Sequence, residues 1–496
     1  MAEEQKKNLS RRTFAKVTAL GVGGVAFAGL DPTKLMAKVP DKWDLDVDVV
    51  VVGAGGAGLA AATIISAAGK SVIVLEKTPA MGGSSLICGG ALSFAGTDMQ
   101  AAENIKDSKE LLYKDLMSVG ENMNTPSLVK VYVDNQLETY EWLKQIGIKF
   151  KMVGIASGMS VPRAHYVTPS DVIKTLSDMA KAKGAKILTG TAATRLVQND
   201  KGQICGVLAE RSSRKLSYGA RSGVILTSGG FSLNKELLAK FVPPMAKAKA
   251  IVGRGCQGDG LKMAWAYGAD IRDTPYLKAT FGFSLNAETI NDSYQFFYHG
   301  GIIVNKEGRR FVNESKSYKL VGDAALVQTD AVGIQVFDSA AWDSAASKEL
   351  RLITALQQKG VIYSAPTLQE LAEKCGIPVS VLEETVREYN ANVAKGVDPQ
   401  FGRVTLAAAY GKPVKIEKPP FYSYPSTAFI LGTYGGVLIN DKTQVVDVFG
   451  NVIPRLFAAG EVIGGVHGAA YMTGTAFGKA LIFGRIAGKT VLALTV

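Results

Sequence analysis

The sequence predicts an α/β fold of two domains. Three observations lead to this prediction. The chain has 496 residues, which is more than one ordinary hydrophobic core accommodates. Its 47% hydrophobic content and its 54 glycines are typical of a globular α/β protein with many tight turns. Finally, buried-strand and glycine-turn patterns occur near both ends of the chain, and a different pattern separates them.

The N-terminus carries the pattern of an export signal. Residues 9–16 read LSRRTFAK, and the weakly apolar stretch VTALGVGGVAFAGL follows. This layout is typical of a twin-arginine (Tat) signal, so residues 1–37 are predicted to be a signal peptide recognised by the Tat export machinery. The apolar stretch is too short for a membrane span. We therefore expect a soluble periplasmic or extracytoplasmic protein, with cleavage after either Ala28 or Ala37.

A dinucleotide-binding pattern follows the signal. The glycine turn Gly53-Ala-Gly-Gly-Ala-Gly58 lies between two strand patterns, residues 46–52 and 71–75, and Glu76 ends the second strand. In such a βαβ unit the glycines allow a tight turn, a close approach to a pyrophosphate and close packing of helix on strand. The helix N-terminus offers free N–H groups to phosphates, and the carboxylate accepts hydrogen bonds from a ribose. The unit therefore predicts a Rossmann-like domain that binds a dinucleotide.

Later segments extend this pattern and identify the cofactor. They read MGGSS (81–85), GVILTSGGFS (223–232), GCQGDGLKMAWAYGA (255–269) and RLFAAGEVIGG (455–465). In this order they resemble the FAD-contacting segments of the fumarate reductase/succinate dehydrogenase flavoprotein superfamily, which includes the 3-ketosteroid dehydrogenases. The resemblance runs from about residue 46 to the end of the chain. It implies FAD contacts at Gly53, Gly55, Gly56, Ala57, Gly58, Glu76, Lys77, Gly82, Gly83, Ser84, Ser85, Gly89, Gly90, Ala192, Ser228, Gly229, Gly230, Asp259, Gly460, Glu461, His467, Thr475, Ala476 and Phe477.

The same resemblance sets the domain organisation. It implies a discontinuous, glutathione-reductase-like FAD-binding domain formed by residues 45–272 and 428–496, with an α+β cap domain at 273–427. The inserted stretch contains a cluster of aromatic residues, a β-pattern (GGIIVNKEGRRFVNE) and amphipathic helical patterns. In this architecture catalysis takes place between the cap and the flavin, where closure excludes water.

The active-site motifs differ from those of the fumarate reductases in this resemblance. Those enzymes keep one arginine shortly after R-F-x-N-E and a second one in H-G-A-N-R-L-G-G. In this chain the corresponding segments are RRFVNESKSYKL and HGAAYMTGTA. Tyr318 stands at the position of the first arginine, and Tyr471 stands at the position of the second. The carboxylate-binding histidine before a Gly-Gly pair is also absent from LGTYGG (431–436). A desolvated dicarboxylate needs cationic partners, which phenols do not provide. The replacement of both arginines by tyrosines therefore favours a neutral carbonyl substrate, whose oxygen accepts hydrogen bonds from phenols.

The tyrosines resemble those of the Δ4-(5α)-type 3-ketosteroid dehydrogenases, through NES-x-x-Y at 313–318 and Y-x-[ST]-G-x-[AS] at 471–476. This resemblance implies that Tyr318 transfers the proton, that Tyr471 polarises the carbonyl or assists it, and that Thr473 tunes a phenol; the roles of the two tyrosines could be exchanged. Proton transfer by a phenol requires surroundings that lower its pKa from about 10. Lys319, beside Tyr318, is expected to be solvated.

These expectations give an FAD-dependent oxidoreductase that transfers hydride between flavin N5 and the carbon β to a carbonyl. The four cysteines form no C-x-x-C or C-x-x-C-H motif and there are only three histidines, so we expect no metal and a separate cytochrome or quinone as electron partner. The net charge is +12, but the basic residues are scattered and form no run or nucleic-acid-binding motif, which argues against nucleic-acid binding. The alternative is a reductase of an unsaturated monocarboxylate, which requires a cation near the flavin. An electron carrier and an oxidase also remain open, as do the reaction direction and the substrate.

Overall fold

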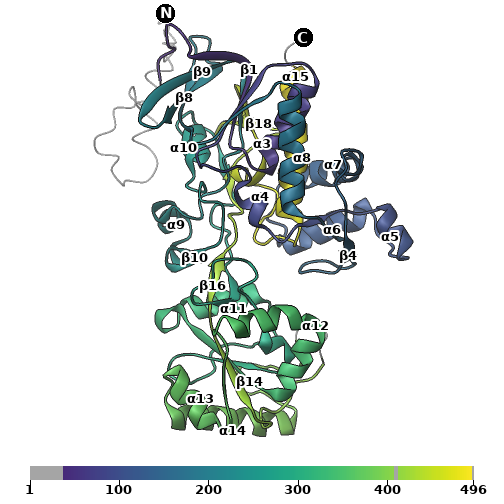
Figure 1. Ribbon diagram of the computed structural model, residues 1–496, viewed down its shortest axis with the longest axis vertical. Helices are drawn as coiled ribbons and strands as arrows, with labels where there is room; N and C mark the ends of the chain where they lie inside the picture. The colour runs from purple at the N-terminus through teal and green to yellow at the C-terminus, as the bar shows by residue number, and fades with distance from the viewer. Residues whose placement is uncertain (1–36, 407–410, 494–496) are drawn as a thin grey trace, which may run out of the picture.

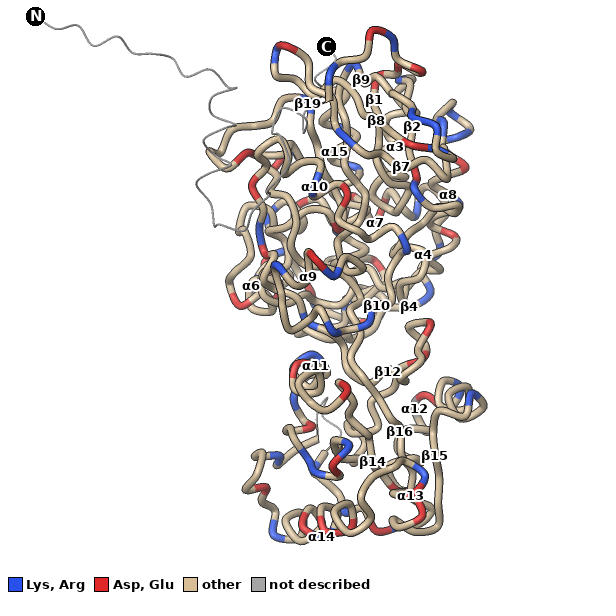
Figure 2. Tube along the Cα trace, turned by 90° about the vertical axis from the view of Figure 1, so that its left-hand side faces the viewer, with Lys and Arg blue, Asp and Glu red and all other residues tan. Residues whose placement is uncertain are grey.

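The computed structural model describes residues 37–406 and 411–493, so most of the predicted signal peptide lies outside the described residues. Two parts are stacked along the long axis of the molecule, and the long strand β16 runs from their junction into the lower part (Figure 1). Figure 2 shows Lys and Arg interspersed with Asp and Glu over both parts. Within the described residues no helix is long and apolar enough to cross a bilayer.

The upper part is built on a mainly parallel sheet with the strand order β18-β19-β9-β1-β2-β6, to which β8 and β7 are added through β9. The strands are β1 (Leu45–Val52), β2 (Val72–Leu75), β6 (Lys186–Leu188), β7 (Ala192–Gln198), β8 (Ile204–Arg211), β9 (Arg214–Leu226), β18 (Gln444–Val446) and β19 (Val452–Ala458). The centre of β1 is a run of valines that is buried throughout, as expected for a parallel strand covered on both faces. The two predicted strands of the βαβ unit are confirmed as β1 and β2, which pair in parallel.

Small residues bring the two ends of the chain together on this sheet. Helix α3 (Gly56–Ala67) packs against the C-terminal helix α15 (Thr475–Ala493) and against α8 (Pro169–Ala182). A Cβ atom on Gly484 would lie 2.4 Å from the carbonyl oxygen of Ala57, so the α3–α15 contact requires glycine. This close contact joins the last segment of the chain to the first βαβ unit.

The lower part has its own mixed sheet, formed by β10 (Lys249–Ala250), β12 (Thr280–Ser284), β13 (Ile302–Val304), β14 (Gly333–Asp338), β15 (Tyr363–Ala365) and β16 (Phe421–Ile430). Four of these strands pair directly with β16. Its helices are α11 (Tyr318–Leu326), α12 (Ser339–Gln358), α13 (Leu368–Cys375) and α14 (Val379–Lys395). The predicted fold class, a Rossmann-like domain with an inserted α+β cap, is thus confirmed. The exact domain boundaries stay predictions, since β10 precedes residue 273 and still pairs with β16.

The remaining elements surround the junction of the two parts and the outer face of the sheet. They are α4 (Gly83–Ile87), β3 (Ala91–Ser93), α5 (Asp98–Ala102), α6 (Lys109–Val119), α7 (Pro126–Gln145), β4 (Met152–Gly154), β5 (Ala164–Tyr166), α9 (Lys235–Phe241), α10 (Asp259–Trp265), β11 (Ile271–Arg272) and β17 (Gly436–Val437).

Candidate active site

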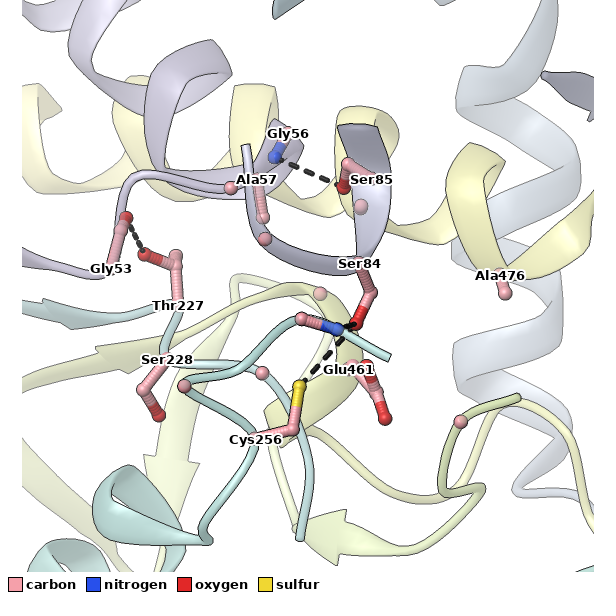
Figure 3. A pocket seen from close by; sticks show the side chains of 18 of the residues that line it. Gly53, Gly56, Ala57, Ser84, Ser85, Thr227, Ser228, Cys256, Glu461 and Ala476 are labelled. Atoms are coloured by element: carbon pink, nitrogen blue, oxygen red, sulfur yellow. Dashed lines mark hydrogen bonds between the residues drawn. The ribbon is translucent and has the colours of Figure 1, made fainter. Parts of the chain in front are cut away.

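One long cavity begins where β1, β2, β9 and β19 end and extends to the first residues of β12 in the cap. Most of the predicted cofactor contacts line it: Gly53, Gly55, Gly56, Ala57, Glu76, Lys77, Gly83, Ser84, Ser85, Ser228, Gly229, Asp259, Gly460, Glu461, His467, Ala476 and Phe477. Figure 3 shows several of these residues around the cavity. Because a parallel sheet binds ligands at the carboxyl ends of its strands, this is the expected position for a dinucleotide.

Other predicted contacts do not line the cavity, namely Gly58, Gly82, Gly89, Gly90, Ala192, Gly230 and Thr475. Several of them serve packing instead. A Cβ atom on Gly58 would lie 2.0 Å from the carbonyl oxygen of Gly53, and one on Gly230 would lie 2.0 Å from the hydroxyl oxygen of Thr433. The Thr475 hydroxyl donates to the carbonyl oxygen of Met472 at 2.6 Å and is therefore already bonded.

The glycine turn has the geometry of a phosphate cradle. Gly53 has φ +109°, and a Cβ atom there would lie 2.5 Å from the carbonyl oxygen of Thr227. The Gly56 N–H at the start of α3 donates to the Ser85 hydroxyl at 3.1 Å (Figure 3). Helix α3 has no side-chain cap, so its first N–H groups and its positive dipole end face the cavity. This end of the cavity fits a pyrophosphate.

The carboxylate of Glu76 is held at the end of β2. One oxygen accepts from the Ala54 N–H at 2.9 Å, and the other accepts from the Thr78 N–H at 2.8 Å. A carboxylate has about four lone-pair positions, so acceptor capacity remains for a ribose hydroxyl. The side chain is therefore oriented in advance for the role that the sequence predicts.

The cavity wall includes Gly253 and Arg254, which stand just before the predicted segment 255–269 and which sequence reasoning missed. The Gly253 N–H donates to the Ser84 hydroxyl at 3.0 Å, and Cys256 Sγ lies 3.3 Å from the same oxygen (Figure 3). A Cβ atom on Gly253 would lie 2.6 Å from the Ser84 nitrogen, so this approach also requires glycine. Nearby, Lys77 pairs with Asp259 at 2.7 Å. The glycines of 253–255 were the available signal, but they match no phosphate-binding motif.

Three aromatic rings form the opposite end of the cavity. The ring centroids of Tyr434, His467 and Tyr471 lie 5.5–5.9 Å apart, and all three residues line the cavity with Lys278 and Thr280. Sequence reasoning selected His467 and Tyr471 but not Tyr434, which stands in the LGTYGG segment between β16 and β17. We refer to these five residues as the aromatic end of the cavity.

The loop that carries His467 is fixed by a carboxylate. One oxygen of Asp273 accepts from the N–H groups of Gly465 and Gly468, at 2.9 and 3.1 Å. Burial lowers the pKa of His467 well below its usual value, and the charges of Lys479 and Lys319 lower it further. The imidazole is therefore neutral at ordinary pH.

The phenols differ from the expectation in their acidity. Burial raises the pKa of Tyr471, and its proximity to Tyr318 contributes to the rise. Burial likewise raises the pKa of Tyr434. The lowered pKa that proton transfer by a phenol requires is therefore not found at Tyr471, because burial disfavours its phenolate form. Both phenols are neutral hydrogen-bond donors rather than bases.

Lys319 is also a correction to the sequence prediction. It is 7% exposed rather than solvated, and its Nζ donates to the carbonyl oxygen of Tyr471 at 3.1 Å, 3.9 Å from the centre of the Tyr471 ring. Burial lowers its pKa to about 7, and the charge of Lys278 adds to the effect. Lys278 itself pairs with Asp323 on α11 at 2.5 Å. Lys319, the second residue of α11, thus points into the protein. No pattern in RRFVNESKSYKL predicts this orientation.

Tyr318 and Thr473 lie beside the cavity rather than on its wall. Tyr318 is the first residue of α11, is partly buried and packs on the main core. It is close enough to the aromatic end to affect the pKa of both cavity tyrosines. Thr473 donates its backbone N–H to the carbonyl oxygen of Ser157 at 3.0 Å.

A buried ionic network fixes the segment before α11. The guanidinium of Arg310 pairs with Glu314 at 2.7 Å and with Asp398 at 3.0 Å, and Arg403 lies 3.5 Å from Glu314. Glu314 is fully buried, so its charge depends on these partners. The network therefore sets the direction in which α11 begins and the position of Tyr318.

Comparisons with known proteins agree with this geometry. The FAD binding domain family matches residues 48–476. The chain is 34% identical over 449 residues to a cytochrome-type fumarate reductase of Shewanella frigidimarina, across 89% of this chain and 76% of that protein. The open conformation of a flavocytochrome c3 fumarate reductase is similar, with a TM-score of 0.82 and 27% identity, over 100% of this chain and 83% of the other.

A second solved structure is 3-ketosteroid-Δ4-(5α)-dehydrogenase from Rhodococcus jostii RHA1 in complex with 4-androstene-3,17-dione. It is 26% identical with a TM-score of 0.72, over 91% of this chain and 98% of the other. Both branches of the predicted resemblance are therefore confirmed. The chain belongs to the FAD binding domain family, within the superfamily of the fumarate reductase flavoproteins and 3-ketosteroid dehydrogenases, and it is an FAD-dependent oxidoreductase that acts on CH–CH bonds.

Proposed function

We propose that this enzyme transfers hydride between flavin N5 and the carbon β to a neutral carbonyl group, with an enone or ketosteroid-like compound as the unsaturated substrate. The observation that carries the proposal is the chemistry of the aromatic end. Two phenols with raised pKa values and a neutral imidazole line it. Neutral donors of this kind bind a carbonyl oxygen well. A carboxylate in the same place would lose its water and would need a cationic partner to offset that cost.

When bound, FAD supplies the hydride chemistry, and the protein supplies orientation and one proton. Tyr471 donates a hydrogen bond to the carbonyl oxygen, which stabilises the enolate charge that develops there. Tyr318 gives or takes the proton at the α-carbon, since it stands at the start of α11 beside the aromatic end. Thr473 orients a phenol. The burial of the Tyr434 and His467 rings helps to exclude water from the reacting atoms.

An unsaturated monocarboxylate is the second candidate, and one observation favours it. Lys278 lines the aromatic end and Lys319 lies directly behind Tyr471, so cations are present outside the motifs of the relatives. However, Asp323 already offsets the charge of Lys278. The lowered pKa of Lys319 also makes its amine about half neutral near pH 7. The carboxylate candidate therefore has a weaker electrostatic basis than the neutral carbonyl.

Matched substrates separate the two candidates. Benzalacetone and cinnamate share one skeleton and differ in a methyl ketone against a carboxylate. The photoreduced holoenzyme is mixed anaerobically with each compound and with fumarate, and flavin reoxidation is followed by absorbance. The proposal expects reoxidation by benzalacetone well ahead of cinnamate, and none by fumarate. Reoxidation by cinnamate or fumarate alone contradicts it.

We further propose that the protein is exported by the Tat machinery to the periplasm and receives electrons from a separate cytochrome or quinone. The support is the pair Arg11-Arg12 before a short apolar stretch and the lack of C-x-x-C-H in the sequence. Replacing both arginines by lysine should leave the protein in the cytoplasm, as measured by cell fractionation. Unchanged periplasmic enzyme would contradict the export proposal.

A further inference from the structure

Tyr434 has a hydroxyl group with no partner in the part of the chain that the structure describes. The residue lies in the segment between β16 and β17 and is only 4% exposed. Its hydroxyl oxygen is buried and has no hydrogen-bond partner among the described residues, although the backbone amide of Lys278 approaches it closely enough to lower its pKa. A buried hydroxyl group that has lost its water partners without gaining others is costly to the folded state. Such a group at a ligand cavity is therefore expected to bond to the ligand.

The position of Tyr434 meets this expectation. Its side chain lines the cavity at the aromatic end, beside Lys278 and Thr280 from the cap. Its ring is packed edge to face with His467 and Tyr471, at 5.9 and 5.5 Å between centroids, and this packing restricts the ring orientation. Tyr434 thus presents a rigid ring at the cavity wall, and its hydroxyl oxygen is covered by the protein.

We propose that Tyr434 is a substrate-binding residue, whose hydroxyl donates a hydrogen bond to the carbonyl oxygen of the substrate together with Tyr471. The inference rests on the proposed function, because it takes a neutral carbonyl compound as the ligand. Two donors that converge on one oxygen form an oxyanion-hole arrangement, which stabilises the developing enolate more than the ground-state ketone. Tyr434 therefore contributes both to binding and to selection of carbonyl compounds over their deoxygenated analogues.

The chemistry of Tyr434 makes it a donor rather than a base. Its pKa is raised by burial first and then by Tyr471, Tyr318 and Asp323, so the phenol stays protonated at neutral pH. A protonated phenol can accept only weakly and must donate to satisfy its proton. A carbonyl oxygen is the acceptor that this arrangement fits.

Tyr389 provides a matched control. Its hydroxyl is also buried without a partner, and its ring packs on Arg310 and Arg403 in the cap core, away from the cavity. Tyr434→Phe and Tyr389→Phe therefore remove the same atom from equally buried sites, and only one of the sites lines the cavity. A general effect of the missing hydroxyl on stability appears in both variants.

The test measures ketone binding and enone reduction separately. The oxidised holoenzyme is titrated with 4-phenylbutan-2-one, the saturated product of benzalacetone, and binding is followed by the perturbation of the flavin absorbance. The photoreduced holoenzyme is then reoxidised with benzalacetone. Tyr434→Phe should keep FAD, raise the Kd for the ketone about 10-fold and slow reoxidation by at least as much, as expected for one lost hydrogen bond. Tyr389→Phe should match the wild type in both measurements.

A Kd within twofold of the wild type for Tyr434→Phe overturns the proposal, and so does a wild-type enzyme that binds no ketone. If the wild type binds the ketone but reduces no enone, the proposed function fails, and the Kd ratio alone decides the role of Tyr434. Should Tyr434→Phe lose FAD, Tyr434→Met replaces it in the same titration, because Met also fills the space without a hydroxyl.

Discussion

Replacing Lys319 by methionine tests the electrostatics of the aromatic end. The amine is 7% exposed, and its pKa is lowered from 10.5 to about 7. That difference corresponds to about 5 kcal/mol between its charged and neutral forms. Since the pKa is lower in the folded state, the unfolded chain binds more protons between pH 7 and 10.5. The cost of burying the charge is therefore full below pH 7 and decreases as pH rises.

The size of the effect follows from the same values. Between pH 6 and pH 9 the wild type should gain about 2–3 kcal/mol of stability from Lys319, and Lys319→Met should not. If the chain unfolds as a unit, this gain raises the melting temperature by about 2–3 °C relative to the variant. Thermal unfolding of the holoenzyme, followed by flavin fluorescence at each pH, measures the difference.

Lys316→Met is the matched control, because Lys316 is exposed and only three residues away. Its melting temperature relative to the wild type should stay constant from pH 6 to 9. The reasoning is refuted if the difference between Lys319→Met and the wild type is also constant over this range, since Lys319 would then carry the same charge in the folded and unfolded states.

Three further predictions concern catalysis, the ionic network and the cofactor. Tyr318→Phe should lower the rate of enone reduction at least about 100-fold while FAD stays bound, because it removes the proposed proton donor; a normal rate would exclude that role. Glu314→Gln should destabilise the protein by about 3 kcal/mol, since it leaves Asp398 as the carboxylate that offsets two buried arginines, whereas Asp178→Asn in an exposed pair should cost less than about 1 kcal/mol in the same urea titration. Gly58→Ala should yield protein without FAD, because its Cβ atom would lie 2.0 Å from a carbonyl oxygen, whereas Gly154→Ala, away from the cavity, meets no atom closer than 3.5 Å and should keep its flavin absorbance; equal flavin content in the two variants would contradict the packing argument.

The glycine turns and the first βαβ unit of the FAD-binding part could be predicted from the sequence. Gly53 and Gly58 are required by contacts of 2.5 Å and 2.0 Å with neighbouring backbone, and such requirements leave a fixed spacing in the sequence. Glu76 likewise ends a buried strand, so its position at the cavity follows from the strand pattern. Local backbone geometry thus carries over directly into sequence patterns.

The aromatic end could be predicted only in part. Tyr471 was identified because it replaces an arginine in a recognisable run, whereas in LGTYGG only the missing histidine was noted and Tyr434 itself was not selected. The burial of Lys319 depends on how α11 meets the loop of Tyr471, across 152 residues of sequence. Likewise, the rise of the phenol pKa values results from desolvation by residues of both parts. These properties arise from tertiary contacts that no local pattern records.

The reoxidation of the photoreduced holoenzyme by benzalacetone and by cinnamate tests the central claim most directly. The two compounds differ only in the group that faces the phenols of Tyr434 and Tyr471 in the proposed complex. A neutral hydrogen-bonding site predicts a rate constant for benzalacetone at least about 10-fold above that for cinnamate, which is the effect of about 1.4 kcal/mol. A faster reaction with cinnamate would contradict the account and would assign the aromatic end to a carboxylate held by Lys278 and Lys319.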